Sequence, residues 1–405
     1  MERKIIKYAK IFHPNQVSRL ALYLLRDEAV SGKFILGATL LALLAANTAL
    51  RGTYEAFWQT DLTIGLGSWS LDKDLRHWVG DGLMALFFLV VGLELKRELV
   101  QGELRKVRTA ALPFAAALGG MVVPALIYLA FNAGTSADRG WAIPMATDIA
   151  FAIGILALVG KRIPASIRLF LLTLAIVDDI GAVIVIAVFY STGLNLVAML
   201  TAVAICALLL ALRSLKRLNL AVFSVGCLFL WLAVNASGLH ASIAGVVMGL
   251  LAPVAAMRPN VKSIAERMEH FMIPISTFVV VPLFAFANTG VVLSLVSFQN
   301  EAALPLASGI VFGLVLGKVV GIVGASWLMV KLNYAELPSA AHWQHVIGVG
   351  FLAGIGFTVS IFVTELAFQS PDFITVSKLS IFIASAISGC LGLIILKRSA
   401  GRLYN

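Results

Sequence analysis

The chain has 405 residues, of which 60% are hydrophobic and only 13% are charged, and its mean hydropathy is +0.96. Soluble domains are about half apolar and about a quarter charged, so this composition excludes an ordinary soluble domain and indicates a membrane protein. Its apolar runs are long and unbroken rather than alternating, which favours spanning helices over a β-barrel. The net charge of +10 does not require a nucleic-acid partner, because the cytoplasmic loops of membrane proteins collect Lys and Arg.

The chain begins with a basic, then amphipathic segment at residues 1–33, which predicts a helix lying on the cytoplasmic leaflet. Twelve apolar segments of membrane-spanning length follow. They are residues 34–50, 78–95, 110–131, 143–159, 169–190, 194–212, 218–236, 240–257, 271–292, 304–330, 346–368 and 374–396. With both termini inside, most of the 31 Lys and Arg residues fall on the cytoplasmic side. We therefore expect an all-α, multi-pass membrane protein with about twelve transmembrane helices.

The segment between the first two predicted helices, residues 61–75, alternates in part and contains Gly65 and Gly67. This pattern predicts a short external β-hairpin. A solvent-facing hairpin has an unpaired edge, and pairing with the same edge of a second subunit would cover it. An ordinary loop fits these residues equally well.

Three carboxylates lie inside the fourth and fifth predicted helices, namely Asp148, Asp178 and Asp179. A charged side chain at bilayer depth costs at least ~2.5–3.5 kcal/mol, so three of them in one helical hairpin indicate a function. The function that we favour is the binding of a cation and of protons. The alternative is a buried ion-pair network without a function, which would leave two carboxylates surplus.

Two of the predicted helices carry signals of an interruption. In the fourth, Pro144 frees a backbone carbonyl, and Thr147 and Asp148 can satisfy loose backbone groups. The eleventh is rich in glycine and hydroxyl residues: Gly348, Gly350, Gly354, Gly356, Thr358 and Ser360. One interrupted helix in each half predicts an inverted-repeat transporter, in which two discontinuous helices cross at the midplane with the site between them. Close packing of helices through small residues is the alternative for the glycines.

Adjacent residues on one helix point about 100° apart, so Asp178 and Asp179 cannot face the same partner. We expect one of them to line a cavity with Asp148. The other is expected to turn toward Lys318, the one Lys or Arg that the prediction places deep in a span. A buried ammonium requires a carboxylate partner. Crossed helix breaks also place partial charges at the midplane, which Asp148 and Lys318 would compensate.

A second polar cluster is expected at the cytoplasmic end of the second predicted helix. The candidates are Asp81, Glu94 and Glu98, approached from before the ninth helix by Glu269 and His270, with His240 as a lone histidine on the external side. The functional interpretation is an ion-access funnel or a pH-sensing patch. A solvated helix end with ordinary ion pairs has equal weight, and a lone histidine is more often structural than a sensor.

Several short motifs occur in a fixed order along the chain. They are residues 81–84 (DGLM), 92–98 (GLELKRE), 146–152 (ATDIAFA), 178–179 (DD), 282–288 (PLFAFAN), 317–318 (GK) and 354–358 (GIGFT). From about residue 31 to residue 398, the chain resembles the NhaA family of sodium/proton antiporters in these motifs. Inverted repeats are already known for that family, so the resemblance rather than the glycine pattern carries this architecture.

The resemblance implies repeats at helices three to five and ten to twelve. A core transport domain would then comprise residues 109–190 and 304–398, scaffold and dimer-interface helices would comprise 34–108 and 191–303, and 399–405 would be a cytoplasmic tail. It implies pH-dependent, electrogenic exchange of protons for Na⁺ or Li⁺ across the inner (cytoplasmic) membrane of a bacterium. It further implies a homodimer, no cofactor beyond the transported ions, and no enzymatic activity.

The resemblance also implies roles for individual residues. Asp179, with Asp178, would carry the transported cation and the proton, and Thr147, Asp148 and Lys318 would compensate charge at the helix breaks. Gly354, Gly356 and Thr358 would belong to the discontinuous eleventh helix. The pH-responsive region would include Glu94, Glu98, Glu269 and His270.

The mechanism that we expect is competition of protons and cation for shared carboxylates. A protonated or cation-loaded site can rearrange, whereas an empty anionic one stalls, and this rule gives coupling. A passive cation channel is one alternative, although broken helices at the midplane favour alternating access. An intramembrane aspartyl protease is a remote one, because the usual Tyr-Asp and Gly-x-Gly-Asp contexts of its catalytic pair do not occur.

Overall fold

The computed structural model describes residues 28–66, 69–102, 105, 107–160, 163–191, 193–254, 262–293 and 301–401. Within these ranges the chain is helical apart from loops and one two-stranded sheet. The amphipathic helix predicted within 1–33 lies mostly outside the described residues, as does most of the predicted tail at 399–405.

The first part of the chain forms the two strands and the first long helices. They are α3 (Glu28–Ala46), α4 (Arg51–Trp58), β1 (Asp61–Leu66), β2 (Trp69–Asp74), α5 (Leu75–His77), η1 (Trp78–Leu83), α6 (Met84–Gln101) and α7 (Val107–Asn132). The two strands pair antiparallel, with Asp61 opposite Asp74 and Leu66 opposite Trp69. The predicted hairpin at 61–75 is therefore confirmed, and the alternative of an ordinary loop is wrong.

The remaining elements follow the predicted helices closely. They are η3 (Asp138–Met145), α8 (Ile149–Val159), α9 (Ala165–Phe189), α10 (Leu196–Ser214), α11 (Leu220–Ala236), α12 (Ala241–Leu251), α13 (Ile264–Ile275), η5 (Ser276–Val280), α14 (Val281–Asn288), α15 (Ala303–Phe312), η7 (Gly313–Gly317), α16 (Lys318–Lys331), α17 (Trp343–Ala353), α18 (Phe357–Ala367) and α19 (Pro371–Gly401). Local signals set several of the starts. Asn195 and Asn219 cap α10 and α11, and Ser263 forms a capping box with Glu266 at the start of α13.

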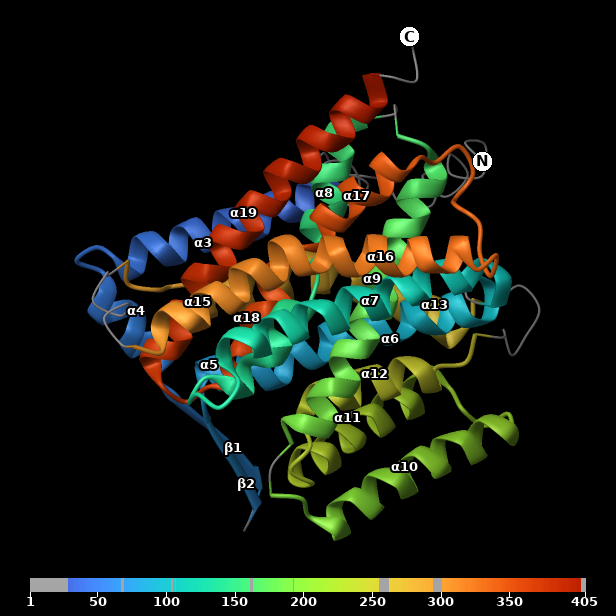
Figure 1. The fold of residues 1–405 in the computed structure, drawn as a ribbon. Coiled ribbons are helices and arrows are strands. Elements are labelled where there is room, and N and C mark those ends of the chain that lie inside the picture. Colours follow the sequence, from blue (N-terminus) through green and yellow to red (C-terminus); the bar gives the residue numbers. More distant parts are fainter. Residues whose placement is uncertain are drawn as a thin grey trace, which may run out of the picture.

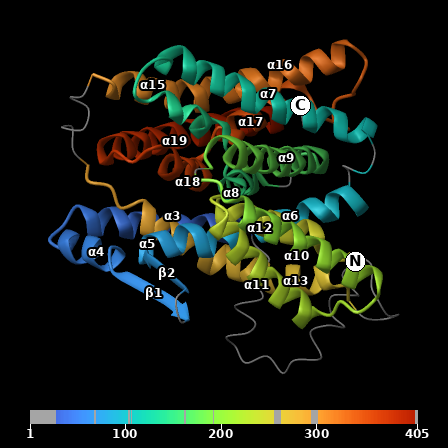
Figure 2. The ribbon, with the colours of Figure 1, turned by 90° about the horizontal axis from the view of Figure 1, so that it is seen from below.

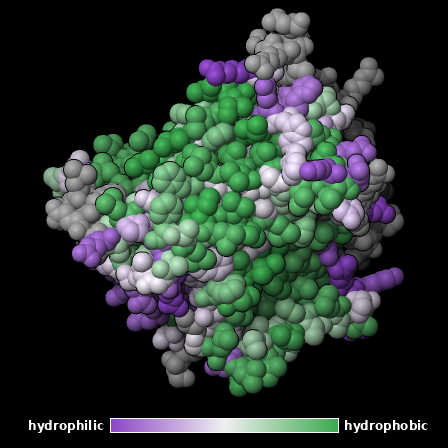
Figure 3. Space-filling model, in the orientation of Figure 1, coloured by the Kyte–Doolittle hydropathy of each residue, from purple (hydrophilic) through white to green (hydrophobic). Residues whose placement is uncertain are grey.

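Eight helices in the described part of the chain are long and apolar enough to cross a membrane, or up to ten if each of two bent pairs is one span. The eight are Leu75–Gln101, Ala110–Asn132, Asp138–Val159, Ala165–Phe189, Leu196–Ser214, Ile264–Asn288, Ala303–Lys331 and Pro371–Ser399. The predicted segments at 218–236 and 240–257 correspond to the shorter apolar helices α11 and α12. The molecular surface agrees, because hydrophobic side chains form a broad band between hydrophilic edges (Figure 3). The all-helical membrane class is confirmed.

The helices form three layers in the view of Figure 2. One outer layer contains α7, α15 and α16, and the other contains α3, α6 and α10 to α13. Helices α8, α9, α17, α18 and α19 lie between them. Helix α14 packs against α3. The hairpin and α4 lie at one end of the molecule, and the C-terminal part of α19 lies at the opposite end (Figure 1). The middle layer therefore holds both of the helices that the sequence predicts to be interrupted.

Glycines bring α6 and α12 into close contact. A Cβ atom at Gly245 would lie 2.1 Å from the backbone oxygen of Ala85, and one at Gly249 would lie 2.5 Å from backbone atoms of Gly92 and Leu93. The two helices can approach this closely only because these positions carry no side chain. Glycines thus set the short distance between α6 and α12 in this outer layer.

We expect Gly245→Ala to destabilise the protein by about 1–3 kcal/mol, because the added methyl group forces α12 away from α6. The matched control is Gly324→Ala on α16, where a Cβ atom has no neighbour within 4 Å. The melting temperature of the detergent-purified protein measures both effects. Equal melting temperatures for the two variants would show that the α6–α12 contact is not tight.

Candidate functional site

The backbone leaves the helical conformation at two places in the middle layer. Between η3 and α8, residues 146–148 are non-helical, and Asp148 has an extended backbone. Between α17 and α18, the chain breaks at residues 354–356 and bends by 45°. Both breaks fall where Pro144 and the glycine-rich stretch predict interruptions.

The two breaks are hydrogen-bonded to each other. The backbone N–H of Asp148 donates to the backbone oxygen of Ile355 at 2.6 Å, and the Thr147 hydroxyl donates to the backbone oxygen of Ala353 at 2.8 Å. Backbone groups freed by a break need partners when no water is present. Each break here supplies partners to the other, so the two interrupted segments hold one another in place.

The Asp148 carboxylate binds the first turns of two helices. Its Oδ1 accepts from the backbone N–H of Phe151 in α8 at 3.3 Å, and its Oδ2 accepts from the backbone N–H of Thr358 in α18 at 3.1 Å and from the Thr358 hydroxyl at 2.5 Å. Helix N-termini carry partial positive charge. Asp148 is 3% exposed and is therefore placed to offset the positive ends of both helices.

Asp178 and Asp179 on α9 have different surroundings. The Lys318 ammonium donates to Asp178 Oδ2 at 2.6 Å, and both side chains are buried. Asp179 is also buried, but its Oδ2 has no hydrogen-bond partner in the described part of the chain. It lines a cavity together with Asp148. The expected division, with one carboxylate in a cavity and its neighbour on Lys318, is confirmed.

The cavity has a volume of about 330 Å³ and a partly polar lining. Its polar side chains are Ser31, Glu94, Thr147, Asp148, Asp179, Ser276, Thr277 and Thr358. It therefore joins the buried aspartates to Glu94 on α6. Ser276 and Thr277 were missed by the sequence analysis. These two adjacent hydroxyl residues follow Pro274 closely inside an otherwise apolar segment, and this pattern could have identified them.

A second group of charges joins α6 to α13. Arg97 forms an ion pair with Glu269, which confirms that the segment before the ninth predicted helix approaches this end of α6. Glu98 is buried, whereas His270 is exposed. Of the predicted cluster, the structure thus brings Glu269 to the end of α6 that carries Glu94 and Glu98.

Asp81 does not belong to this cluster, so that prediction is wrong. It lies about 20 Å from Glu94 along the helix, at 1.5 Å per residue. Its Oδ2 accepts instead from the Lys73 ammonium of β2 at 2.5 Å, and its backbone oxygen accepts from the Trp231 indole at 3.2 Å. Asp81 therefore ties the hairpin to the start of the membrane helix.

His240 lies outside the cavity as well. Its Nε2 donates to the backbone oxygen of Tyr190 at 2.8 Å, where α9 ends and α12 begins. This contact fits the structural interpretation of a lone histidine.

Lys318, which the sequence places deep in a span, is not the only buried lysine of the described residues. Lys378 in α19 is 5% exposed and pairs with Glu365 of α18 at 2.5 Å. The prediction missed this pair because Lys378 lies near the start of its apolar segment, where a basic residue was assigned to the membrane surface.

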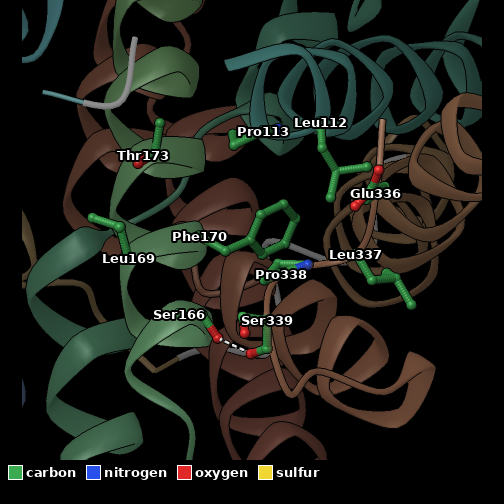
Figure 4. Close-up of a pocket in the computed structure, with 10 residues that line it drawn as sticks. All are labelled: Leu112, Pro113, Ser166, Leu169, Phe170, Thr173, Glu336, Leu337, Pro338 and Ser339. Carbon is green, nitrogen blue, oxygen red and sulfur yellow. Dashed lines mark hydrogen bonds between the residues drawn. The ribbon is translucent and has the colours of Figure 1, made fainter. Parts of the chain in front are cut away.

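A larger cavity of about 630 Å³ lies between the start of α7, the first turns of α9 and residues 336–339 (Figure 4). The Ser166 hydroxyl donates to the backbone oxygen of Ser339 across it at 2.6 Å. Neither the three buried aspartates nor Lys318 lines this cavity. Its size alone therefore does not identify it as an ion site.

Buried carboxylates lie at the meeting point of two interrupted helices, among helices of membrane-spanning length, and this combination is typical of membrane proteins that transport charged species. The family model described as Na⁺/H⁺ antiporter 1 matches residues 23–396. The chain belongs to this family. Its members are transporters rather than enzymes, and the ions are substrates rather than cofactors.

Three relatives show how close the similarity is. The Na⁺/H⁺ antiporter NhaA of Rhodospirillum rubrum is 46% identical over 93% of this chain and 96% of its own length. The Na⁺/H⁺ antiporter NhaA 2 of Clostridium beijerinckii is 43% identical over 93% of each chain. The NhaA antiporter of Shewanella loihica is 44% identical over 91% of this chain and 94% of its own.

Proposed function

We propose that this protein exchanges Na⁺ or Li⁺ for protons across the inner membrane of a bacterium, electrogenically and in a pH-dependent manner. The observation that carries the proposal is the surroundings of Asp179. Asp179 lines a cavity with Asp148, and its Oδ2 lacks a partner among the described residues, while the neighbouring Asp178 is neutralised by Lys318. A buried carboxylate without an internal partner requires a proton or a cation to neutralise it.

The coupling follows from this requirement. A proton bound to Asp179 removes one negative charge from the cavity. A dehydrated Na⁺ bound to the same carboxylate also offsets one negative charge. Carboxylate, hydroxyl and backbone oxygens are the ligands that a hard cation prefers, and Asp148, Thr147 and Thr358 add such oxygens to the cavity. An unoccupied, charged site resists passage through the apolar interior. Only the two loaded forms then change access, which gives exchange. One proton for one Na⁺ would move no net charge, so electrogenic exchange requires a second proton, which would come from the Asp178–Lys318 pair.

We expect the apparent Michaelis constant for Na⁺ to rise about tenfold for each pH unit of acidification, over the range in which protons occupy the site, because the metal requires the deprotonated carboxylate. The measurement is Na⁺ uptake by proteoliposomes at several pH values. An apparent Na⁺ affinity that is the same at all pH values would refute competition.

The same vesicles distinguish an antiporter from a passive cation channel. An imposed proton gradient should drive Na⁺ uphill, and reversing the gradient should reverse the flux. A channel would only dissipate the Na⁺ gradient.

We also propose the finer architecture, with twelve spans, inverted repeats and both termini in the cytoplasm. The contact between the two breaks supports it, since each proposed repeat contributes one break. So does the placement of α7 to α9 and α15 to α19 in adjoining layers, with α6 and α10 to α13 as the scaffold (Figure 2). Membrane-impermeant thiol reagents added to intact cells should label Arg139→Cys but not Arg105→Cys. Each substitution is made in a variant from which Cys206, Cys227 and Cys390 have been removed.

A homodimer joined through the hairpin at 61–75 is part of the proposal. β1 pairs only with β2 in the described sheet, so each strand keeps one unpaired edge. Hydrophobic side chains on β1 are exposed, including Leu62 and Ile64. Replacing both with Lys should shift the detergent-solubilised protein from dimer to monomer in light scattering, and an unchanged mass would exclude this interface.

We finally propose that the charges at the end of α6 that carries Glu94 and Glu98 set the response to pH. The support is the Arg97–Glu269 ion pair, which links α6 to α13, together with the cavity that extends from Asp179 to Glu94. Glu269→Gln should displace the pH profile of exchange while leaving the maximal rate intact. A superimposable profile would remove Glu269 from this role.

A further inference from the structure

A buried histidine lies in the first turn of α17, outside the site described above. The Nδ1 of His345 accepts a hydrogen bond from the backbone N–H of His342 at 3.0 Å. An acceptor Nδ1 means that the neutral ring carries its proton on Nε2. That Nε2 is buried and has no hydrogen-bond partner in the described structure. His345 therefore holds a donor that no described side chain or backbone group satisfies.

A second donor of the same kind lies on α19. The Ser399 hydroxyl is buried and also lacks a partner in the part of the chain that the structure covers. Ser399 and His345 line one cavity of about 460 Å³, together with Trp343 and Gln344 from the start of α17. Buried polar atoms are almost always hydrogen-bonded, so two orphaned donors at one cavity indicate that something occupies it.

The electrostatics of this cavity favour an anion. It lies at the N-terminus of α17, where the helix dipole is positive. The backbone N–H groups of His342 and His345 are bonded within the cap, whereas those of Trp343 and Gln344 have no partner among the described residues. Lys397 and Arg398 precede Ser399, are exposed, and form no ion pair within the described ranges. None of the described residues that line the cavity is an Asp or a Glu, and Glu336 lines the neighbouring cavity instead.

We propose that this cavity binds a phosphate group, held by the His345 Nε2–H, the Ser399 hydroxyl and the free N–H groups at the start of α17. Oxyanions bind at helix N-termini through this combination of donors and dipole. The group belongs either to free phosphate or to the headgroup of an anionic lipid. Binding would clamp the start of α17 to the end of α19. The far end of α17 is Ala353, whose backbone oxygen holds Thr147, so the clamp would steady one side of the break.

The test uses the full-length protein in nanodiscs of phosphatidylcholine and measures thermal stability and calorimetric binding, neither of which requires exchange activity. One arm adds inorganic phosphate against chloride at equal ionic strength. The other replaces part of the lipid with phosphatidylglycerol. The variant is Ser399→Ala, and the matched control is Ser326→Ala. Ser326 is also buried, with a hydroxyl that has no partner among the described residues, but it lines none of the three cavities described above.

We expect a saturable stabilisation that Ser399→Ala weakens at least tenfold in apparent affinity and that Ser326→Ala leaves unchanged. Ser399→Asp, which places a carboxylate in the cavity, should abolish it. A response to inorganic phosphate identifies a free anion, and a response to phosphatidylglycerol alone identifies a lipid headgroup. The proposal is overturned if neither probe stabilises the protein, which indicates a cavity filled by water only. It is likewise overturned if Ser399→Ala responds as the unmodified chain does.

Discussion

Asp179→Asn should abolish Na⁺-dependent proton movement in proteoliposomes, a loss of at least a hundredfold in rate. The amide has nearly the shape of the carboxylate, but it neither ionises nor takes up a proton. Without a change of charge, the site no longer distinguishes its two loaded forms. The expected defect is therefore in coupling rather than in folding.

We expect Asp179→Asn to fold normally because of the surroundings of this carboxylate. Asp179 is 2% exposed, and its Oδ2 has no partner among the described residues, so the substitution breaks no contact at that atom. Removing a buried charge also removes its cost of burial. We expect the melting temperature to stay level or to rise, which separates this variant from one that merely misfolds.

The matched control is Asp138→Asn, which makes the same chemical change at an exposed position at the start of η3. It should exchange Na⁺ at the unmodified rate. Calorimetry should show Na⁺ binding to the control and none to Asp179→Asn. Normal exchange by Asp179→Asn would remove this residue from the proposed mechanism.

Much of the fold could be predicted from the sequence because the bilayer imposes so strong a constraint. Apolar runs near twenty residues locate the helices, and Pro144 and the glycines around Gly354 locate the breaks. The hairpin followed from alternation. Segments of eleven or seventeen residues, such as α12 and α11, are harder to assign, because length no longer separates a spanning helix from a buried one.

The parts of the site that depend on the geometry of a single helix could be predicted from the sequence. A 100° offset separates neighbours on a helix, and this was enough to predict that one aspartate faces the cavity and the other faces Lys318. The structure shows which is which, with Asp178 on Lys318 and Asp179 in the cavity. Contacts between elements were less accessible. The bond from Thr358 to Asp148, the Asp81–Lys73 pair and the Lys378–Glu365 pair each depend on how distant segments pack. Spacing within a single segment contains no information about them.

Lys318→Ala should destabilise the protein by about 3–5 kcal/mol, the usual effect of removing one partner from a buried ion pair. The lysine is 0% exposed and its partner Asp178 is 1% exposed, so no solvent can replace the lost ammonium. The melting temperature should therefore fall clearly. The matched control, Lys331→Ala at the exposed end of the same helix, removes only a contact with the Trp327 ring and should cost no more than about 1 kcal/mol.

A second substitution separates pairing from other roles of the lysine. In Lys318→Ala with Asp178→Asn, no uncompensated charge remains, so much of the stability should return. Buried pairs replaced by neutral groups are often no less stable than the original. If the double variant is as unstable as Lys318→Ala alone, the lysine stabilises the protein through something other than Asp178.

Electrical measurements on Lys318→Ala, in which Asp178 is still present, then decide whether Lys318 carries one of the exchanged protons. If it does, the charge moved per Na⁺ must change when the lysine is absent, because one titrating group has been removed from the cycle. If Lys318 only neutralises Asp178, the charge moved per Na⁺ stays the same while the rate falls. Full charge movement per Na⁺ would thus exclude the lysine as a proton carrier and leave Asp178 and Asp179 as the groups that exchange protons for the cation.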